Sequence, residues 1–148
     1  MKVSTRVEYG LIALTDIAIH SDNGKAITAS EIADRQHISL KYLEQILMSL
    51  KQAGFVRSQK GVGGGYMLSR SSGNIVMSDI LNALDTTILA DTYSSETETE
   101  ECLRPLVNSC FWEKMNEYLR SFTANLTLSE LISRCNGHSD EKWDMYMI

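Results

Sequence analysis

The sequence predicts a mainly α-helical protein with one small β-hairpin. Two short amphipathic segments, residues 28–36 and 39–53, follow each other across a tight break. A glycine-rich stretch at 61–65 joins two segments of strand character, and a run of about twenty residues from Pro105 repeats apolar side chains at helical spacing. These observations predict a winged helix-turn-helix domain plus a long C-terminal dimerisation helix.

The composition is that of a folded globular protein. With 148 residues, 43% of them apolar and 22% charged, the chain has room for one domain and an appended helical element. It lacks both the run of about eighteen apolar residues that a membrane span needs and the apolar core of a signal peptide, so we expect a cytoplasmic protein with no membrane partner. Three cysteines, an odd number without framework spacing, predict no structural disulfide.

Charge is divided unequally along the chain. The net charge is −5, but residues 1–70 carry nine basic and six acidic side chains, whereas residues 71–148 carry five basic and thirteen acidic ones. The imbalance is greatest within 39–70, where five basic residues face a single acid, Glu44. Charge on a DNA-binding protein matters by location, so we expect this segment to contact phosphates.

Apolar spacing and helix caps predict the N-terminal elements. Apolar side chains at three- and four-residue steps indicate an amphipathic helix over residues 4–21. Thr28 and Glu31 form a capping-box pattern that begins a second, short helix. Ser39 is placed to cap a third helix, which ends before Gly54, a residue suited to the left-handed position after a helix. Two short helices joined by a tight turn are the helix-turn-helix pattern.

A β-hairpin follows directly. Residues 55–60 and 66–68 have strand character, and the glycine cluster 61–65 is their turn. This cluster lacks the Lys-Ser/Thr ending of a phosphate-binding loop and is not followed by a helix, which argues against a nucleotide site. A hairpin in this place is a wing. We assign residues 1–84 to the DNA-binding domain, whose N-terminal helix is shared with the dimer interface.

The C-terminal half predicts a loop, a pairing helix and a tail. Residues 85–104 are expected to form an acidic, solvated loop, and Pro105 suits the first turn of the helix that follows. The apolar stripe of that helix is longer than a small wing domain can cover, so pairing with a second copy would bury it. We expect the dimerisation helix and a short closing helix within 105–134, and a tail without clear period at 135–148.

Candidate DNA-binding residues lie on the third helix and the hairpin. Side chains in the first two turns of a reading helix reach base edges in the major groove, where Gln pairs with adenine and Glu accepts from cytosine. Glycines at a hairpin tip permit close approach to a DNA backbone or minor groove, and neighbouring cations supply charge. The candidate set is Ser39, Lys41, Tyr42, Glu44, Gln45, Arg57, Lys60, Gly61 and Gly63.

The runs Glu31-Ile32-Ala33, Ile38 to Ile46, Gly54-Phe55-Val56 and Lys60 to Tyr66 resemble the Rrf2 family of bacterial transcription regulators, and the resemblance continues to about residue 134. It implies a homodimer that pairs through the long helix, binds a palindromic operator and usually represses. By position, Ser39, Tyr42, Glu44 and Gln45 match the family's reading helix, and Lys60 with Gly61 matches its minor-groove wing tip. Arginine and proline are common in the family where this chain has Lys60 and Val62.

The same resemblance raises the question of a sensor. Iron–sulfur members place three cysteines on the loop before the long helix, and a side chain near residue 8 of the partner subunit can complete the cluster. Here the corresponding ligands are Cys102, Cys110 and Glu8, and the cysteines depart from the usual register. The chain is expected to be controlled by an iron–sulfur cluster, by its thiol state or by a protein partner. Cys110 also suits a buried position on the apolar stripe, and Glu8 a solvent-facing one.

Two other classes of function were weighed. The first is a protein-interaction module without DNA affinity that uses the long helix and the acidic loop, against which the basic bias of residues 39–70 argues. The second is an enzyme, for which the sequence offers no nucleophile–base pair, metal triad or phosphate loop. The sequence therefore predicts a DNA-binding regulator that is not an enzyme.

Overall fold

A computed structural model describes residues 2–21, 23–91 and 103–146 of the chain. In chain order its elements are α1 (Thr5–His20), α2 (Ala29–Gln36), α3 (Leu40–Gln52), β1 (Val56–Gln59), β2 (Gly65–Leu68), the short 3-10 helix η1 (Ser72–Asn74), α4 (Met77–Leu84), α5 (Arg104–Val107), the π-helical turn η3 (Asn108–Trp112), α6 (Glu113–Asn125) and α7 (Leu128–Tyr146). The mainly helical fold class with one antiparallel hairpin is confirmed.

Local sequence explains where the first two helices begin. The hydroxyl of Ser4 accepts from the backbone N–H of Val7 at 3.3 Å and caps α1. At α2 the capping box is complete: the Thr28 hydroxyl accepts from the Glu31 N–H at 3.1 Å, and the Glu31 carboxylate accepts from the Thr28 N–H at 2.7 Å. α2 ends at Gln36, and the left-handed backbone of the next residue, His37 (φ 54°), turns the chain toward α3.

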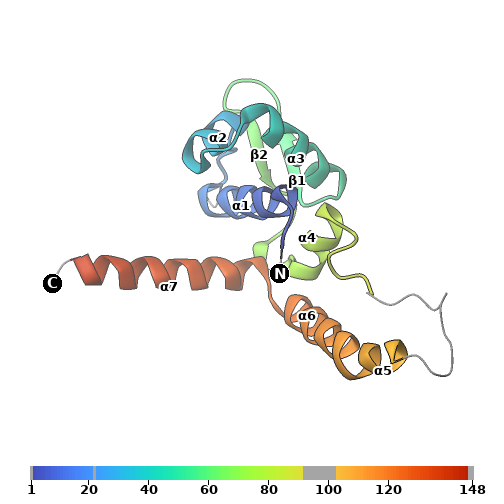
Figure 1. Cartoon of the computed structure of the whole chain (residues 1–148). Coiled ribbons are helices and arrows are strands. Elements are labelled where there is room, and N and C mark those ends of the chain that lie inside the picture. Colours follow the sequence, from blue (N-terminus) through green and yellow to red (C-terminus); the bar gives the residue numbers. More distant parts are fainter. Residues whose placement is uncertain (1, 22, 92–102, 147–148) are drawn as a thin grey trace.

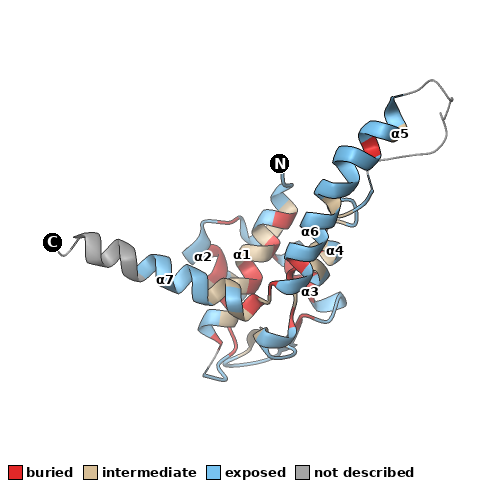
Figure 2. Cartoon of the chain, turned by 90° about the horizontal axis from the view of Figure 1, so that it is seen from below, coloured by how far each residue is buried: buried red, intermediate tan, exposed pale blue. Residues whose placement is uncertain are grey.

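The core lies between α1, α2, α3 and α4, with the hairpin closing one side (Figures 1 and 2). Each of these helices buries one face and exposes the other, as amphipathic spacing requires. The largest fully buried side chains are Leu14, Ile17, Ile32, Leu43, Ile46, Leu47, Leu50, Ile75, Ile80 and Leu128. Leu128 belongs to α7, so the start of that helix is part of the core.

The hairpin is fixed to the chain segment that precedes α2. β1 and β2 pair in antiparallel register from Val56 opposite Leu68 to Gln59 opposite Gly65. Ile27 adds a bridge to β2, donating to the carbonyl of Tyr66 at 2.9 Å and accepting from the Tyr66 N–H at 2.7 Å. The wing therefore has a set position relative to the start of α2.

A second bridge, between Val76 and Thr127, joins the segment before α4 to the C-terminal helices. The N–H of Met77 donates to the carbonyl of Leu126 at 2.8 Å, and the N–H of Leu128 donates to the carbonyl of Ile75 at 2.8 Å. From this point α6 and α7 leave the body in different directions (Figure 1). The C-terminal end of α6 and the start of α7 are thus anchored to the residues that lead into α4.

Two expectations for the C-terminal half are wrong in detail. The helix after Pro105 is not one regular helix, because the π-helical turn interrupts it between α5 and α6. The closing helix is not short: α7 continues to Tyr146 through most of the predicted tail. Residues 133–139 of α7 are exposed. The sequence analysis judged helix length from the periodic spacing of apolar residues. These positions of α7 bury no face against the body, so they carry no such spacing.

No helix in the described part of the chain is both long and apolar enough to cross a membrane.

Candidate nucleic-acid interface

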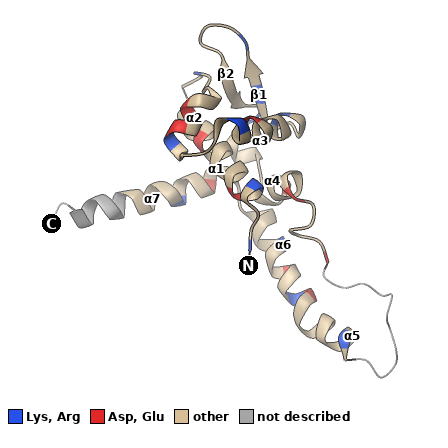
Figure 3. Cartoon of the chain, turned by 45° about the horizontal axis from the view of Figure 1, so that its top comes forward, with Lys and Arg blue, Asp and Glu red and all other residues tan. Residues whose placement is uncertain are grey.

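α3 presents a polar face to solvent because its opposite face is in the core. Leu43, Ile46, Leu47 and Leu50 are fully buried. The remaining positions of the helix carry the sequence-predicted reading residues: Lys41, Glu44 and Gln45 are all exposed. Figure 3 shows basic residues, in blue, on α3 and on the neighbouring β1. A helix with this exposed face and this charge suits the major groove.

The N-terminus of α3 differs from those of α1 and α2. Ser39 occupies the N-cap position and is exposed, but its side chain makes no capping hydrogen bond, contrary to expectation. The first intrahelical contact is the Leu43 N–H donating to the Ser39 carbonyl at 2.9 Å. The N–H groups of the first turn are therefore not satisfied by a side-chain cap, which suits an end of a helix that meets a phosphate.

Tyr42 has a different environment from the other predicted reading residues. It is half-buried, and its ring packs edge-on against the ring of Tyr9 in α1, with 6.0 Å between centroids and 71° between planes. This contact joins the first turn of α3 to α1. Tyr42 therefore helps to orient α3 against α1.

All of the residues predicted for the wing tip are exposed. Lys60, Gly61 and Gly63 are exposed, and both glycines have left-handed backbones, with φ 88° and 75°. Between them stands Val62, whose relative exposure of 110% makes it the most protruding of the large apolar side chains described. Sequence reasoning did not list Val62 as a site residue; the signal was an apolar residue between glycines at a hairpin tip.

The basic side chains of α3 and the hairpin differ in whether they have partners within the protein. Lys51 donates to the Ser58 hydroxyl at 2.7 Å, and Arg70 lies over the Phe55 ring at 5.1 Å, so these side chains brace the hairpin. Arg57 is exposed and contacts the Met67 sulfur at 4.0 Å. Among the residues that the structure describes, Lys41 and Lys60 have no hydrogen-bond or ion-pair partner in the protein. These two lysines are available to phosphates.

A buried carboxylate holds the turn between α2 and α3. Asp16 of α1 has a fully buried side chain that accepts from Arg35 at 3.0 and 2.8 Å and from Gln36 at 2.8 Å. The His20 ring lies 3.4 Å away. Burial raises the pKa of Asp16, but the hydrogen bonds from Arg35 and Gln36 outweigh it and hold that pKa below its ordinary value. The sequence analysis missed this residue, which is one of two acids in α1, the other being Glu8.

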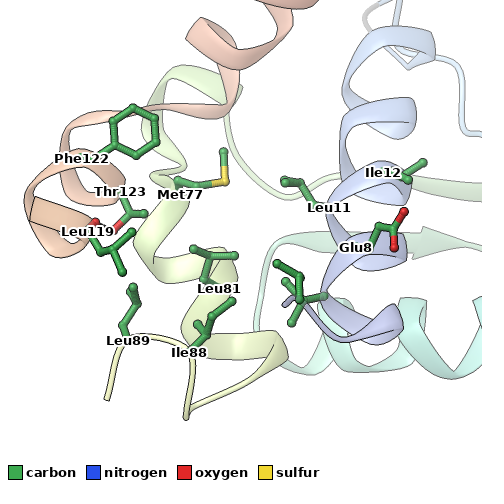
Figure 4. A pocket seen from close by; sticks show the side chains of 12 residues that line it. Glu8, Leu11, Ile12, Met77, Leu81, Ile88, Leu89, Leu119, Phe122 and Thr123 are labelled. Carbon is green, nitrogen blue, oxygen red and sulfur yellow. Dashed lines mark hydrogen bonds between the residues drawn. The ribbon is translucent and has the colours of Figure 1, made fainter. Parts of the chain in front are cut away.

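An apolar pocket of about 480 Å³ lies between α1, α4, the turn after α4 and α6 (Figure 4). Glu8 is the one charged residue in its lining, and Figure 4 shows it on α1 across from α4 and α6. The other lining residues are Val3, Val7, Leu11, Ile12, Met77, Leu81, Ile88, Leu89, Leu119, Phe122 and Thr123. The pocket is therefore an apolar surface bordered by one carboxylate.

A second apolar surface continues from this pocket along the pairing helix. Large apolar side chains of η3, α5 and α6 stand exposed in the protomer, and Tyr118 is 78% exposed. The set, here called the arm face, is Leu103, Leu106, Val107, Phe111, Trp112, Met115, Tyr118 and Phe122. Cys110 is exposed among them, which corrects its alternative assignment as a buried residue.

The proposed cluster ligands do not come together within the described part of one protomer. Cys110 precedes Leu119, which lines the pocket with Glu8, by nine residues, or roughly 13 Å at about 1.5 Å per helical residue. Cys102 lies outside the described residues. No group of three His, Cys, Asp or Glu side chains within the described residues is placed to hold a metal ion. Within the described residues of one chain, Cys110 and Glu8 therefore do not form a cluster site by themselves.

Comparison with known proteins agrees with this fold. Residues 3–134 match the model of a family described as Rrf2, iron-dependent transcriptional regulator. The chain belongs to the Rrf2 family. Its α7 continues twelve residues beyond the match, to Tyr146.

Relatives and solved structures are regulators of the same kind. The HTH-type transcriptional regulator IscR of Xenorhabdus nematophila is 33% identical over 132 residues, 89% of this chain and 79% of the relative. The structure of CymR, the global cysteine regulator of B. subtilis, superposes with a TM-score of 0.78 at 27% identity, covering 90% of this chain and 98% of CymR. T. potens IscR gives a TM-score of 0.73 at 30% identity, covering 91% and 88%. The matched family is one of transcription regulators and not of enzymes, as predicted.

Proposed function

We propose that this Rrf2-family regulator binds a palindromic operator sequence-specifically as a homodimer and represses transcription in the cytoplasm. The observation that carries the proposal is the reading surface: the exposed polar face of α3, with Lys41, Glu44 and Gln45, beside a glycine-tipped wing with Lys60. Lys41 and Lys60 supply charge for phosphates, and Glu44 and Gln45 supply an acceptor and a donor–acceptor pair for base edges.

The arm face supports the homodimer. Eight large apolar residues stand exposed from Leu103 to Phe122, a surface of a kind that monomers rarely expose, and the adjacent pocket is apolar as well. A second copy of the chain offers the same apolar face, so two arm faces can cover each other. Two reading helices in such a dimer would contact half-sites one helical turn apart, about 34 Å.

A selection experiment tests the proposal. The purified protein would be used to select duplexes from a random pool, and the selected sequence would be footprinted. We expect a two-fold symmetric site and an affinity at least about a thousandfold above that for random DNA. Lys41→Glu and Lys60→Glu should each weaken binding, while Lys114→Glu, which changes an exposed residue of α6, should not.

Failure of the selection would identify a different function. If the folded protein enriched no sequence and bound all duplexes equally, sequence-specific regulation would be refuted. If Lys41→Glu and Lys60→Glu also left the biological activity of the protein untouched, the protein-interaction module would replace it. Repression itself is measured with a reporter placed behind the selected operator: wild-type protein should lower its output, and a rise would show an activator.

We propose that the controlling signal acts on the segment between α4 and α5, as an iron–sulfur cluster, a thiol change or a protein partner. Protein purified without oxygen distinguishes them. A cluster gives brown protein with visible absorption that Cys102→Ser removes. A colourless protein whose operator affinity changes with oxidant identifies a thiol sensor. A colourless protein that is insensitive to oxidant requires a partner.

A further inference from the structure

A single arginine joins three helices of the DNA-binding domain. Arg6 lies in the first turn of α1 and is half-buried. Its Nε donates to the main-chain carbonyl of Leu84 at 3.1 Å, and its Nη2 donates to the hydroxyl of Ser49 at 2.7 Å. Leu84 is the last residue of α4, and Ser49 belongs to the reading helix α3. The guanidinium is thus shared between the end of α4 and α3.

On the α3 side, the contact extends to a reading residue. The Ser49 hydroxyl donates in turn to the main-chain carbonyl of Gln45, at 3.3 Å and one helical turn back. Gln45 is exposed on the polar face of α3. The Arg6 guanidinium is therefore linked through Ser49 to the backbone of Gln45, one of the predicted reading residues.

On the α4 side, close packing of Leu84 holds the carbonyl that Arg6 contacts in place. Leu84 is buried, and its side chain packs so closely on Gly10 of α1 that a Cβ at Gly10 would stand 2.6 Å from the Leu84 Cδ1. The end of α4 is therefore closely packed against α1. Arg6 donates to a carbonyl at the C-terminus of that helix, where the helix dipole favours a cation.

The segment that leaves α4 is itself attached to the pairing helix. Arg120 of α6 donates to the carbonyl of Leu89 at 3.3 Å and forms an ion pair with Asp91. Hydrogen bonds therefore link α6 to residues 89–91, residues 85–90 to one another and to α4, and the end of α4 through Arg6 to Ser49 of α3. Energetic coupling between distant sites is carried by contiguous networks of this kind, and a claim of coupling needs a direct test.

We propose that Arg6 is a positioning residue for DNA recognition, which ties the reading helix to the end of α4 and transmits movements of residues 85–91 to operator affinity. The inference rests on the proposed function and names how that function is regulated. Arginine is required because its planar fork places two donors in fixed directions, whereas one ammonium group cannot bridge the Leu84 carbonyl and the Ser49 hydroxyl in the same geometry.

The first test measures operator and random-duplex affinities for wild type, Arg6→Ala, Arg6→Lys and Ser49→Ala, with thermal unfolding and molecular mass as checks on folding and dimerisation. Arg6→Ala and Arg6→Lys should each lose about tenfold in operator affinity and Ser49→Ala about threefold, in the range of one lost hydrogen bond. Random-duplex affinity and its salt dependence should not change. Lys114→Ala, an exposed charge deletion on α6, is the matched control.

The second test is a double-mutant cycle with Arg120. Arg120→Ala frees residues 89–91 from α6 and should alter operator affinity about threefold in wild type, but should have no effect once Arg6 is alanine. Additive effects, or no effect of Arg120→Ala in wild type, would refute the transmission. Unchanged operator affinity in both Arg6 variants would refute the positioning role.

The remaining outcomes are also decisive. A loss at operator and random DNA alike, with a salt slope reduced by about one, would make Arg6 a phosphate contact instead. A loss that follows only the unfolded fraction, and that Arg6→Lys restores, would make its role structural. If wild type itself did not discriminate operator from random DNA, the proposed function would fail, and the inference with it.

Discussion

The reading domain, meaning α1 to α4 with the hairpin, and the arm face differ in how their apolar side chains are covered. In the domain built from α1 to α4, one chain is sufficient: the core side chains are fully buried, and no buried side-chain polar atom within the described residues lacks a hydrogen-bond partner. Along the arm face, the apolar side chains remain exposed in the protomer. The polar face of α3 is thus held in position by its own chain, whereas the apolar side chains of the arm face are not covered by their own chain.

Charging the arm face should have the largest effect. Phe111→Glu together with Met115→Glu places two carboxylates on a surface that we expect two chains to bury. The variant should run at the mass of the 16.6 kDa protomer. Its operator affinity should fall at least about a hundredfold, because the half-sites then bind independently. Light scattering and binding titration measure both, with Lys114→Ala as a control. A dimer of normal affinity would show that another surface pairs the chains.

Removing the Asp16 carboxylate should destabilise the reading domain and leave the arm as it is. Asp16→Ala strands the Arg35 guanidinium, which is 34% exposed in the folded chain, so we expect a loss of about 2–3 kcal/mol in the free energy of unfolding, at the lower end of the range for a broken buried pair. Urea denaturation measures it. Asp34→Asn, at an exposed position of α2, should change little.

The same carboxylate makes stability depend on acid. The pKa of Asp16 is lower in the folded chain than its ordinary value of 3.8, so its contribution to stability is present above that value and is lost as the pH falls through the folded pKa. Wild type should therefore lose more stability than Asp16→Asn between about pH 5 and pH 2. Equal slopes for the two proteins in acid denaturation would show that the pKa of Asp16 does not differ between the folded and unfolded chains.

Gly65→Ala should disturb the wing by a smaller amount. Gly65 has a φ of 140°, and a Cβ there would stand 2.5 Å from the Ile27 carbonyl carbon and oxygen, which are backbone atoms that cannot move aside cheaply. The bridge between Ile27 and Tyr66 should open, with a loss of about 1–2 kcal/mol in stability and a lower operator affinity. Gly73→Ala, whose nearest neighbour is 3.8 Å away, is the control. A normal affinity would mean that the wing does not depend on this bridge.

The sequence indicated features that arise from local or periodic patterns. The capping box of Thr28 and Glu31, the buried stripe of α3 and the glycine turn of the wing depend on neighbours along the chain, and the structure agrees with each. The Asp16–Arg35 pair and the Arg6 contacts join residues far apart in sequence, so no local pattern could reveal them. The length of α7 was missed for a different reason, since a helix without a buried face has no apolar period.

Lys60→Ala should have the smallest effect and tests what the wing contributes. Lys60 is exposed and has no protein partner among the described residues, so its removal should leave the free energy of unfolding unchanged. If it contacts a phosphate, operator and random-duplex affinities should fall by the same few-fold factor, and the salt slope should drop by about one. A loss at the operator alone would instead mean that Lys60 reads the minor groove. Because Val62 stands fully exposed beside it, Val62→Ala distinguishes apolar contact at the tip from charge. If charge alone matters there, Val62→Ala should bind as wild type does.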